Sequence, residues 1–571
     1  MSNNNDAAIA LLEKHFDIAF AAPDGIKKLR KLILSLAMQG KLVPQDPSDQ
    51  PASELLKEIE VEKNRLVKEG KIKQSKPLPE IESDELPYDV PKSWEWVRLA
   101  TIGEINPRNT CEDDMDAGFV PMPLIFAGYR SLHKFEIRKW SEIKKGYTHF
   151  ADGDVALAKI TPCFENGKSC VFDGLPNGIG AGTTELHVFR NTFNCIYSNY
   201  LFAYFKTSKY LALGASKMTG SAGQKRVPTD FFSLNPFPLP PLSEQRRIVA
   251  KIDELMARCD ELEKQRSDRD RKQITVHTAA LNRLLIAKEQ SNFNTAWQFI
   301  TQHFGELYSV KENVTELRKA ILQLAVMGKL VPQDPNDQPA SELLKEIEEG
   351  KKSLVKEGKV KGLKPLALRD YEKLPFKLPS SWIWTSIERL CETIVDCPHS
   401  TPQFVLNGII CIDTNSFKGG KIINHKLRYV SKETYTDRVK RLSPQVDDVI
   451  FAREGSVGES VIVPQGMVCC LGQRVMLFRP AYVITSRYLQ LSISNQLFWA
   501  RLLAFHKGIG AKHVNVKDMK NALISLPPLA EQHRIVAKID QLMALCNNLE
   551  KQIDHANSKQ TNLLNAVMTK I

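Results

Sequence analysis

The sequence predicts an α+β protein in which two mixed α/β domains are joined by long antiparallel coiled-coil helices, with an internal pseudo-twofold repeat. The main observation is that much of the chain occurs twice. Residues 29–60 match residues 317–348 at 27 of 32 positions, and residues 239–265 match residues 526–552 at 21 of 27. Repeats at a constant offset indicate duplicated structural units, which pack most simply about a twofold axis.

Two unlike segments separate the matching blocks, at about residues 98–238 and 386–525. Their lengths agree to about one residue, yet they differ almost throughout, so one scaffold carries two inserts with different surfaces. The two copies join near Ser291–Thr295. The expected domains are an N-terminal helical region (1–92), a first insert domain (93–238), a central long helix with a second helical region (239–380), a second insert domain (381–525) and a C-terminal coiled-coil helix (526–571).

The composition favours a polyanionic partner. The 571 residues include 78 Lys and Arg against 66 Asp and Glu, a formal net charge of +12. The N-terminus lacks the basic and apolar regions of a signal peptide, and no apolar run is long enough to cross a bilayer, so we expect a cytoplasmic protein. The eleven cysteines form no CxxC pair and no zinc-ligand spacing, so we expect neither a metal site nor a disulfide.

Residues 243–288 are expected to form one helix of about 45 residues, roughly 68 Å long. Apolar residues spaced alternately by four and three predict a coiled-coil seam that serves helix pairing and partner binding. These seam residues are Ile248, Ile252, Leu255 and Leu262 in the first repeat and Ile535, Ile539, Leu542 and Leu549 in the second. Two such helices are expected to lie antiparallel as a spacer. A helix packed on the surface of its own domain is the alternative.

Shorter helices are expected elsewhere in the repeated regions. Segments 7–38 and 295–326 carry apolar stripes and stop at a glycine, Gly40 or Gly328, while 51–73 and 339–361 are charged helices or linkers. The inserts differ in kind. Their short runs of Val, Ile and Phe, broken by Gly, Pro and Asn, predict mainly β cores with a helical portion near 197–213 and 485–505.

This arrangement favours recognition of double-stranded DNA at two places. A nearly identical surface that occurs twice can bind the same partner twice. B-DNA presents the same groove face about every 34–36 Å, so two readers on a helical spacer could sample two half-sites. Because the inserts differ, the half-sites should differ, with unread base pairs between them.

Polar and basic residues in the glycine-rich loops of the inserts are the candidates for DNA contact, since Arg and Lys suit guanine edges and Gln suits adenine. Each of them could equally be an ordinary surface residue or contact only phosphate. They are Lys159, Thr161, Lys168, Thr183, Thr184, Gln224, Lys225 and Arg226 in the first insert and Arg453, Gln473, Arg474, Lys507, Lys512 and His513 in the second.

The repeated blocks resemble a known family. LPPLSEQRRIVAKIDELM and LPPLAEQHRIVAKIDQLM are similar to the element that closes each target recognition domain in specificity subunits of type I restriction-modification systems. VPKSWEWVRL and LPSSWIWTSI are similar to the element that opens those domains, and GTTELHVFR and GQRVMLFRP resemble strands inside them. The resemblance covers essentially the whole chain, in the order block, insert, block, insert, block.

The resemblance implies a non-catalytic, sequence-recognising subunit with two target recognition domains separated by long antiparallel helices. It implies assembly with two modification subunits into an adenine-N6 methyltransferase that uses S-adenosylmethionine. Addition of restriction subunits, expected as two ATP- and Mg-dependent translocase-nucleases, would complete the enzyme. No cofactor is expected in this chain itself.

Two alternatives were weighed. A methyltransferase within this chain would need a cofactor loop at a helix N-terminus, but Gly178–Gly182 is followed by the strand-like TTELHVF. The Pro240-Pro241 pair is flanked by leucines, which cannot hold a flipped adenine, and no ATP-binding P-loop occurs. A stand-alone two-domain DNA-binding regulator is the second alternative, but it leaves the near-identical scaffold blocks without a purpose.

Overall fold

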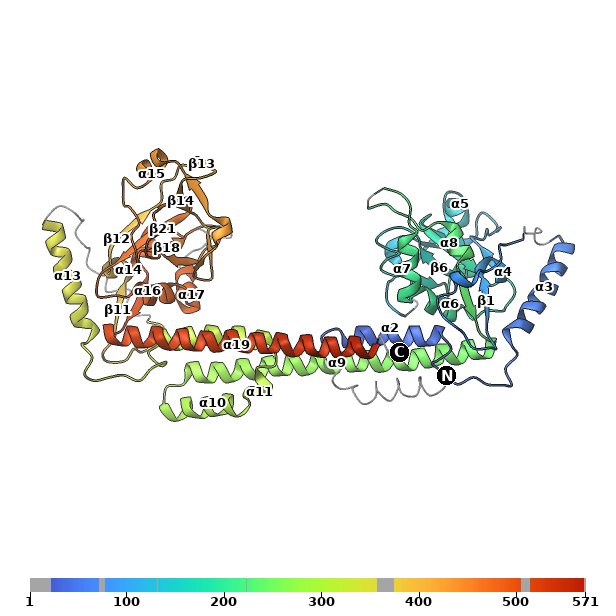
Figure 1. Cartoon of the computed structure of the whole chain (residues 1–571), viewed down its shortest axis with the longest axis horizontal. Coiled ribbons are helices and arrows are strands. Elements are labelled where there is room, and N and C mark those ends of the chain that lie inside the picture. The colour runs from blue at the N-terminus through green and yellow to red at the C-terminus, as the bar shows by residue number, and fades with distance from the viewer. Residues whose placement is uncertain are drawn as a thin grey trace. The chain divides into compact units, whose positions relative to one another are not determined.

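The structure is a computed structural model that describes residues 22–70, 77–130, 132–221, 223–356, 374–504 and 514–568. It divides into two compact units. Unit 1 comprises residues 1–268 and 557–571, and unit 2 comprises residues 269–556. Each unit consists of a helical frame and one insert domain, which begins and ends with a pair of antiparallel strands (Figure 1).

The first insert domain is closed at its base by β1 paired with β10, the first and last strands of the insert. Its two four-stranded sheets have the orders β2-β9-β6-β7 and β4-β3-β8-β5. The strands are β1 (Glu95–Arg98), β2 (Glu104–Ile105), β3 (Asp116–Val120), β4 (Glu136–Lys139), β5 (Thr148–Ala151), β6 (Val155–Ala158), β7 (Ser169–Val171), β8 (Ile179–Gly182), β9 (Leu186–Arg190) and β10 (Pro236–Leu239).

The second insert domain repeats the base and the first sheet of this plan and differs in the second sheet. Strands β11 and β22 close its base, and its first sheet, β12-β21-β18-β19, matches β2-β9-β6-β7. Its second sheet has the order β13-β17-β14-β20, whose parallel pair β14–β20 matches β3–β8. The strands are β11 (Ile383–Ser386), β12 (Cys391–Asp396), β13 (Phe404–Val405), β14 (Ile409–Ile412), β15 (Phe417–Lys418), β16 (Lys421–Ile422), β17 (Arg428–Val430), β18 (Val449–Ala452), β19 (Ser460–Ile462), β20 (Cys469–Leu471), β21 (Val475–Pro480) and β22 (Leu523–Leu526).

Several helices also have a counterpart in the other unit, such as α2 and α12, α6 and α16, and α9 and α19. The helices that begin in unit 1 are α2 (Gly25–Met38), α3 (Ala52–Lys68), α4 (Leu99–Ile102), α5 (Trp140–Ile143), α6 (Ser198–Phe205), α7 (Ser208–Ser216), α8 (Thr229–Leu234) and α9 (Leu242–Ile286). Those that begin in unit 2 are α10 (Gln290–Gln302), α11 (Phe304–Leu307), α12 (Lys311–Val326), α13 (Ala340–Lys356), α14 (Ile387–Leu390), α15 (Lys432–Arg438), α16 (Ser486–Ile493), α17 (Gln496–Ala504), α18 (Val516–Asn521) and α19 (Leu529–Met568).

The long helix expected at 243–288 is confirmed as α9, whose 45 residues span both units. Near its start, Ile248 and Ile252 are fully buried in a core that they share with α2 and α6, and Leu255 and Leu262 pack against it half-buried. The same holds in unit 2, where Ile535, Ile539, Leu542 and Leu549 of α19 pack with α12 and the second insert domain. In these stretches the seam therefore contacts the frame of its own unit.

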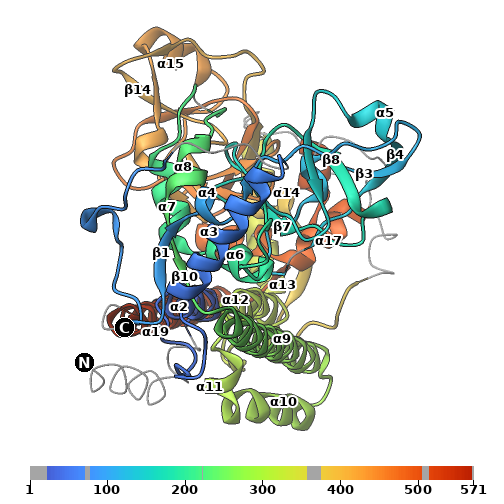
Figure 2. The same cartoon turned by 90° about the vertical axis from the view of Figure 1, so that its right-hand side faces the viewer.

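The frame helices end where the sequence predicts. Gly40 and Gly328, just after α2 and α12, have φ of +66° and +70°, a conformation that favours glycine. A Cβ at either position would lie only 2.4 or 2.5 Å from Cγ of Pro91 or Pro379, so there is no room for a side chain. In unit 2, α10 and α11 fold back beneath the end of α9 (Figures 1 and 2), and Ala296 and Ile300 are buried there. Segment 7–24 of the first predicted helical pair lies largely outside the described residues.

A buried carboxylate fixes each insert domain to its long helix. Glu244, 1% exposed, accepts hydrogen bonds from the indole Nε1 of Trp94 at 2.9 Å and from Nε2 of Gln45 at 2.5 Å. Glu531 accepts the same bonds from Trp382 and Gln333, at 2.8 and 2.6 Å. We call Trp94–Glu244–Gln45 and Trp382–Glu531–Gln333 the carboxylate clusters.

The glutamine that follows each of these glutamates is also buried and completes the attachment. Gln245 Oε1 accepts from the Tyr197 N–H at 2.7 Å, and Gln532 Oε1 accepts from the Thr485 N–H at 3.0 Å. Tyr197 and Thr485 immediately precede α6 and α16, the helices that underlie the sheets of the insert domains. The repeated Glu-Gln pair therefore sets how each insert domain sits on its helix.

Candidate nucleic-acid interface

In the first insert domain the candidate residues gather at the end of β6. Lys159 follows this strand, and its N–H donates to the carbonyl of Glu185 at 2.9 Å while its own carbonyl accepts from the Val227 N–H at 2.8 Å. The N–H of Thr161 donates to the carbonyl of Lys225 at 3.0 Å. Three loops distant in sequence therefore meet where the sheet ends.

Arg226, in the third of these loops, is held by Glu185. Its Nε and Nη2 donate to the two carboxylate oxygens at 2.7–3.1 Å, and its Nη1 donates to the Gln224 carbonyl at 3.1 Å. These hydrogen bonds lower the pKa of Glu185 and raise that of Arg226. Because its nitrogens already have partners within the domain, Arg226 orients this loop, and its contact with DNA stays a prediction.

The remaining candidates of the first domain lie beside this point. Thr183 Oγ1 accepts from the Glu185 N–H at 3.2 Å, and Thr184 is exposed between them. The carbonyl of Lys168 accepts from Ala158, the last residue of β6, at 2.9 Å, and its Nζ donates to the Met122 carbonyl at 3.1 Å. All eight candidate residues of the first insert are thus near one end of one sheet.

The second insert domain builds the equivalent point at the end of β18. Arg453 follows this strand, its N–H donates to the carbonyl of Arg474 at 2.9 Å, and its carbonyl accepts from the Val514 N–H at 3.0 Å. These are the bonds that Lys159 makes in the first domain. Lys159 and Arg453 therefore occupy equivalent positions, and so do Glu185 and Arg474.

Acidic side chains surround Arg453. Its side chain is only 9% exposed, its Nη1 lies 3.3 Å from a carboxylate oxygen of Asp396, and its Nη2 lies 3.7 Å from Glu454. Its Nε has no hydrogen-bond partner in the part of the chain that the structure describes. This Nε is buried, so Arg453 is held largely within the domain, and its contact with DNA stays a prediction.

Arg474 has the opposite exposure. Its side chain is 61% exposed, its Nε lies 3.4 Å from Glu454, and its backbone has φ of +64°, which a residue with a side chain rarely adopts. The neighbouring Gln473 donates from Nε2 to the His399 carbonyl at 3.0 Å. Lys507, Lys512 and His513, the other candidates of this insert, lie outside the described residues.

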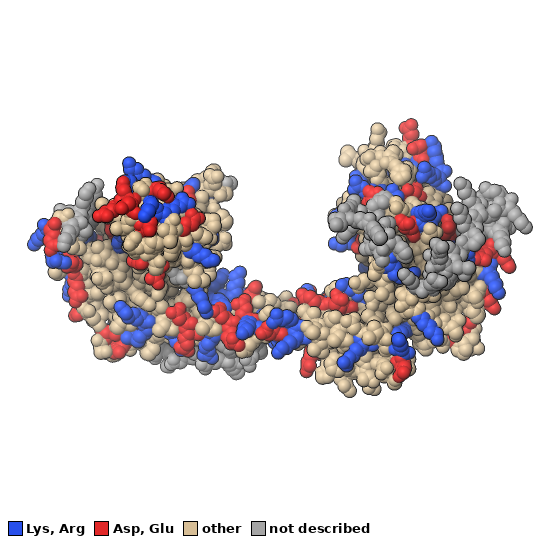
Figure 3. Space-filling view, turned by 180° about the vertical axis from the view of Figure 1, so that it is seen from behind, with Lys and Arg blue, Asp and Glu red and all other residues tan. Residues whose placement is uncertain are grey.

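Three acids that the sequence analysis did not select, Glu185, Asp396 and Glu454, belong to these two points. A carboxylate can accept from the amino group of cytosine, so acids are as informative in a reading surface as bases. Figure 3 shows Lys and Arg interspersed with Asp and Glu on the faces of both units that it presents. Neither face visible there is a uniformly basic patch.

Within the ranges that the structure describes, no group of three or more His, Cys, Asp or Glu side chains could hold a metal ion. Over the same residues, no helix has the length and apolar character required to span a membrane. Nine of the eleven cysteines are buried, and Cys111 and Cys163 are partly exposed.

Comparison with known proteins agrees with this geometry. The family model described as "Type I restriction modification DNA specificity domain" matches residues 91–269 and 409–556, which include both points. The chain is 43% identical over 550 residues to the type I restriction enzyme EcoAI specificity subunit of Escherichia coli, covering 95% of this chain and 93% of that protein. It is 41% identical over 563 residues to the EcoEI specificity subunit of Escherichia coli, with the same coverages.

Two solved structures are more distant. One, described as "Structural basis underlying complex assembly and conformational transition of the type I R-M system", has 20% identity and a TM-score of 0.47, covering 85% of this chain and 98% of its own. The HsdS subunit from Thermoanaerobacter tengcongensis has 20% identity, a TM-score of 0.44 and the same coverages.

The chain belongs to the family of type I restriction-modification specificity subunits. Its role is to provide the DNA sequence specificity of such a system, and the two insert domains are its target recognition domains. We call them recognition domains 1 and 2 below.

Proposed function

We propose that this subunit recognises a bipartite, asymmetric DNA site and that each recognition domain reads one half of it. The observation that carries the proposal is the pair of equivalent points at the ends of β6 and β18. They have the same backbone hydrogen bonds but different side chains, Lys159 beside Glu185 in one and Arg453 beside Arg474 in the other.

The chemistry of these side chains supports unlike half-sites. An arginine donates two parallel hydrogen bonds to O6 and N7 of guanine, and a lysine can donate to the same atoms. A glutamate accepts from the amino group of cytosine. The opposite charges at one equivalent position, Glu185 against Arg474, therefore favour different base edges, since a carboxylate accepts hydrogen bonds and a guanidinium donates them.

We further propose that the chemistry is carried out by partners. The relatives are specificity subunits of type I restriction enzymes, and the duplicated frame offers the same surface twice. Two modification subunits with S-adenosylmethionine would methylate adenine at N6, and two restriction subunits with ATP and Mg²⁺ would translocate and cut DNA. The subunit itself would bind no cofactor and would work in the cytoplasm, where its DNA lies.

Coexpression with the cognate modification subunit in a host without other adenine methyltransferases tests this proposal. Methylome sequencing should give one motif of two unlike specific halves separated by unspecified bases. Size exclusion with light scattering should give two modification subunits per chain. A continuous motif, or a chain that binds DNA and forms no complex, would favour a stand-alone regulator instead.

A further inference from the structure

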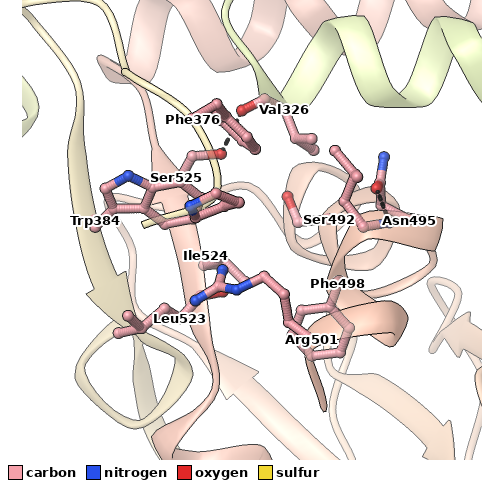
Figure 4. Close-up of a pocket in the computed structure, with 12 residues that line it drawn as sticks. Val326, Phe376, Trp384, Ser492, Asn495, Phe498, Arg501, Leu523, Ile524 and Ser525 are labelled. Atoms are coloured by element: carbon pink, nitrogen blue, oxygen red, sulfur yellow. Dashed lines mark hydrogen bonds between the residues drawn. The ribbon is translucent and has the colours of Figure 1, made fainter. Parts of the chain in front are cut away.

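The pocket of unit 2 shown in Figure 4 is nearly filled by its own lining. Phe376, Trp384 and Arg501 line it, and the described residues leave room for about one water molecule. It therefore has no space for an organic ligand. A charged hairpin on the surface of recognition domain 2 is, by contrast, open to a partner.

This hairpin consists of β15 and β16, which have no counterpart among the described strands of unit 1. Phe417 lies opposite Ile422, and both pack into the core of the domain. Lys418 lies opposite Lys421, and both are exposed. Directly opposite residues of an antiparallel pair project from the same face, with Cβ atoms about 4.5–5.5 Å apart. The hairpin therefore holds two ammonium groups side by side on its outer face.

The surrounding segment adds to this positive charge. Like charges directly opposite each other on a sheet repel and are destabilising. Residues 414–428 contain four Lys or Arg residues and one His, but no Asp or Glu. One of the four, Arg428, is paired with Asp413, whereas Lys426 is exposed beside an open hollow. Cations held together in this way favour an anionic ligand that lies against both of them.

The hairpin is attached to the end of β18, where the candidate residues for DNA contact gather. Its turn, Gly419-Gly420, has φ of +59° and +78°, as one type of two-residue hairpin turn requires. The Gly419 N–H donates to a carboxylate oxygen of Glu459 at 2.6 Å. The backbone carbonyl of Glu459 accepts from the N–H of Ala452, the residue before Arg453, at 2.9 Å. The lysine pair is thus connected through Glu459 to the point at Arg453.

We propose that Lys418 and Lys421 bind the phosphate backbone of duplex DNA beside the half-site that recognition domain 2 reads. A phosphate that lies against both ammonium groups offsets their repulsion, and lysine binds phosphate as a point charge. Contacts with phosphate position a protein on the duplex and carry no sequence information directly. The inference rests on the proposed function, in which this domain binds DNA, and adds to it a contact that is independent of sequence.

Recognition domain 1 builds the corresponding stretch differently. Residues 121–135 connect β3 to β4, as residues 413–427 connect β14 to β17, but their described part forms no hairpin of two strands. The two Lys or Arg residues of this stretch are Arg130, which lies 3.1 Å from Asp260 of α9, and Lys134. This phosphate contact therefore belongs to recognition domain 2 alone.

Salt-dependent DNA binding by the complex with the cognate modification subunit tests the inference, with one duplex that contains the methylated motif and one that lacks it. The double variant Lys418→Gln/Lys421→Gln should bind both duplexes at least about tenfold more weakly at about 0.1 M salt. The slope of log affinity against log salt should fall in magnitude by about 1 to 2, because one or two phosphate contacts are lost. The ratio of the two affinities should not change.

The matched control is Lys57→Gln/Lys345→Gln, which removes the same charge from exposed, equivalent positions of α3 and α13 and should leave the slope unchanged. A second variant, Lys418→Glu, places opposite charges across the hairpin. Its thermal stability should equal or exceed that of the parent chain, while its DNA affinity should fall further than that of Lys418→Gln.

The outcomes separate this inference from the proposed function. A complex that methylates a bipartite motif but keeps its salt slope in the double variant would overturn the lysine contact alone. A loss confined to the duplex with the motif would also overturn it, since the lysines would then read bases. A parent complex that binds no DNA would overturn both the inference and the proposed function.

Discussion

The two recognition domains share one sheet and differ in the other. In β2-β9-β6-β7 and β12-β21-β18-β19 the strand order, the register and a buried ion pair are the same. In the second sheets, β5 pairs with the strand β8, whereas β13 lies at the opposite edge beside β17, and β15 and β16 have no counterpart among the described strands of unit 1. The shared sheet fixes orientation on the frame, and the loops and sheet beyond it are free to differ in what they contact.

The largest effect should come from the buried ion pair of the shared sheet. Asp154 and Asp448, both 2% exposed, accept from Nε and Nη2 of Arg190 and Arg479 at 2.7–3.0 Å. Asp154→Ala and Asp448→Ala should each lower the free energy of unfolding of their own unit by about 3–5 kcal/mol, because each leaves a partly buried arginine without its carboxylate partner. Amide hydrogen exchange reports each unit separately.

The exposed Asp230 gives the control for that measurement, since Asp230→Ala should stay within about 0.5 kcal/mol. A large loss in free energy of unfolding in one unit with a negligible loss in the other would show that the two sheets are not energetically equivalent. That result would contradict the claim that the two domains share one sheet with the same role.

The carboxylate clusters should give the next largest effect, again equal in both units. Glu244→Ala and Glu531→Ala each strand two hydrogen-bond donors, Trp94 and Gln45 or Trp382 and Gln333, so we expect losses of about 2–4 kcal/mol. Hydrogen exchange of α6 or α16, the helix whose first turn is bonded to the neighbouring glutamine, measures the loss. Unequal losses, or losses spread over both units, would contradict a local attachment.

A buried histidine in unit 1, at a position where unit 2 has a methionine, should make the stability of the two units depend differently on pH in acid. His187 on β9 pairs with Leu157, while the equivalent register position on β21, opposite Phe451, is Met476. Burial lowers the pKa of His187 to about 4, and its Nδ1 has no partner among the described residues. In the unfolded chain His187 binds a proton near its ordinary pKa of about 6.5. The contribution of the neutral, buried His187 to the stability of unit 1 is therefore fully present above pH 6.5 and is lost as the pH falls towards 4.

His187→Met should therefore remove about 2–3 kcal/mol of acid destabilisation from unit 1 between pH 6.5 and 4. Unit 2 should be unaffected. Unfolding by urea at several pH values tests this, and an unchanged pH dependence in the variant would assign the acid sensitivity to other groups.

The smallest effects should appear in DNA affinity. Lys159→Gln and Arg453→Gln should each cost about 1–3 kcal/mol in binding of the cognate duplex by the assembled complex. Each loss should vanish when the half-site of that same domain is already altered, because the contact is then absent. Lys264→Gln, at an exposed position on α9, is the control for a lost charge. Anisotropy titrations at fixed salt measure these losses.

Much of the fold could be predicted because it rests on local patterns. The constant offset between repeated blocks predicted the duplication, and the spacing of apolar residues predicted the helix observed as α9. Gly40 and Gly328 predicted where α2 and α12 end. The β-rich inserts and their helical portions near α6–α7 and α16–α17 were predicted from turn residues and apolar runs. The surface that the coiled-coil seam contacts could not be predicted. A spacing of four and three residues identifies an apolar stripe, but it does not identify the surface that covers Ile248 and Ile252.

The candidate residues for DNA contact were chosen from loop composition, and their contact with DNA stays a prediction. Charged and polar residues in glycine-rich loops were found, and the structure brings those of the first domain to one end of β6. The acids were missed because Glu185 and Arg226 are 41 residues apart, as Asp396 and Arg453 are 57 residues apart, and only the sheet brings them together.

Exchange of one recognition domain tests the central claim most directly. Residues 98–238 would be replaced by the corresponding insert of another family member, with both carboxylate clusters retained, and the hybrid coexpressed with the cognate modification subunit for methylome sequencing. One domain per half-site predicts a bipartite motif in which one half is new and the other is that of the parent chain. A motif with both halves altered, or with neither, would contradict it.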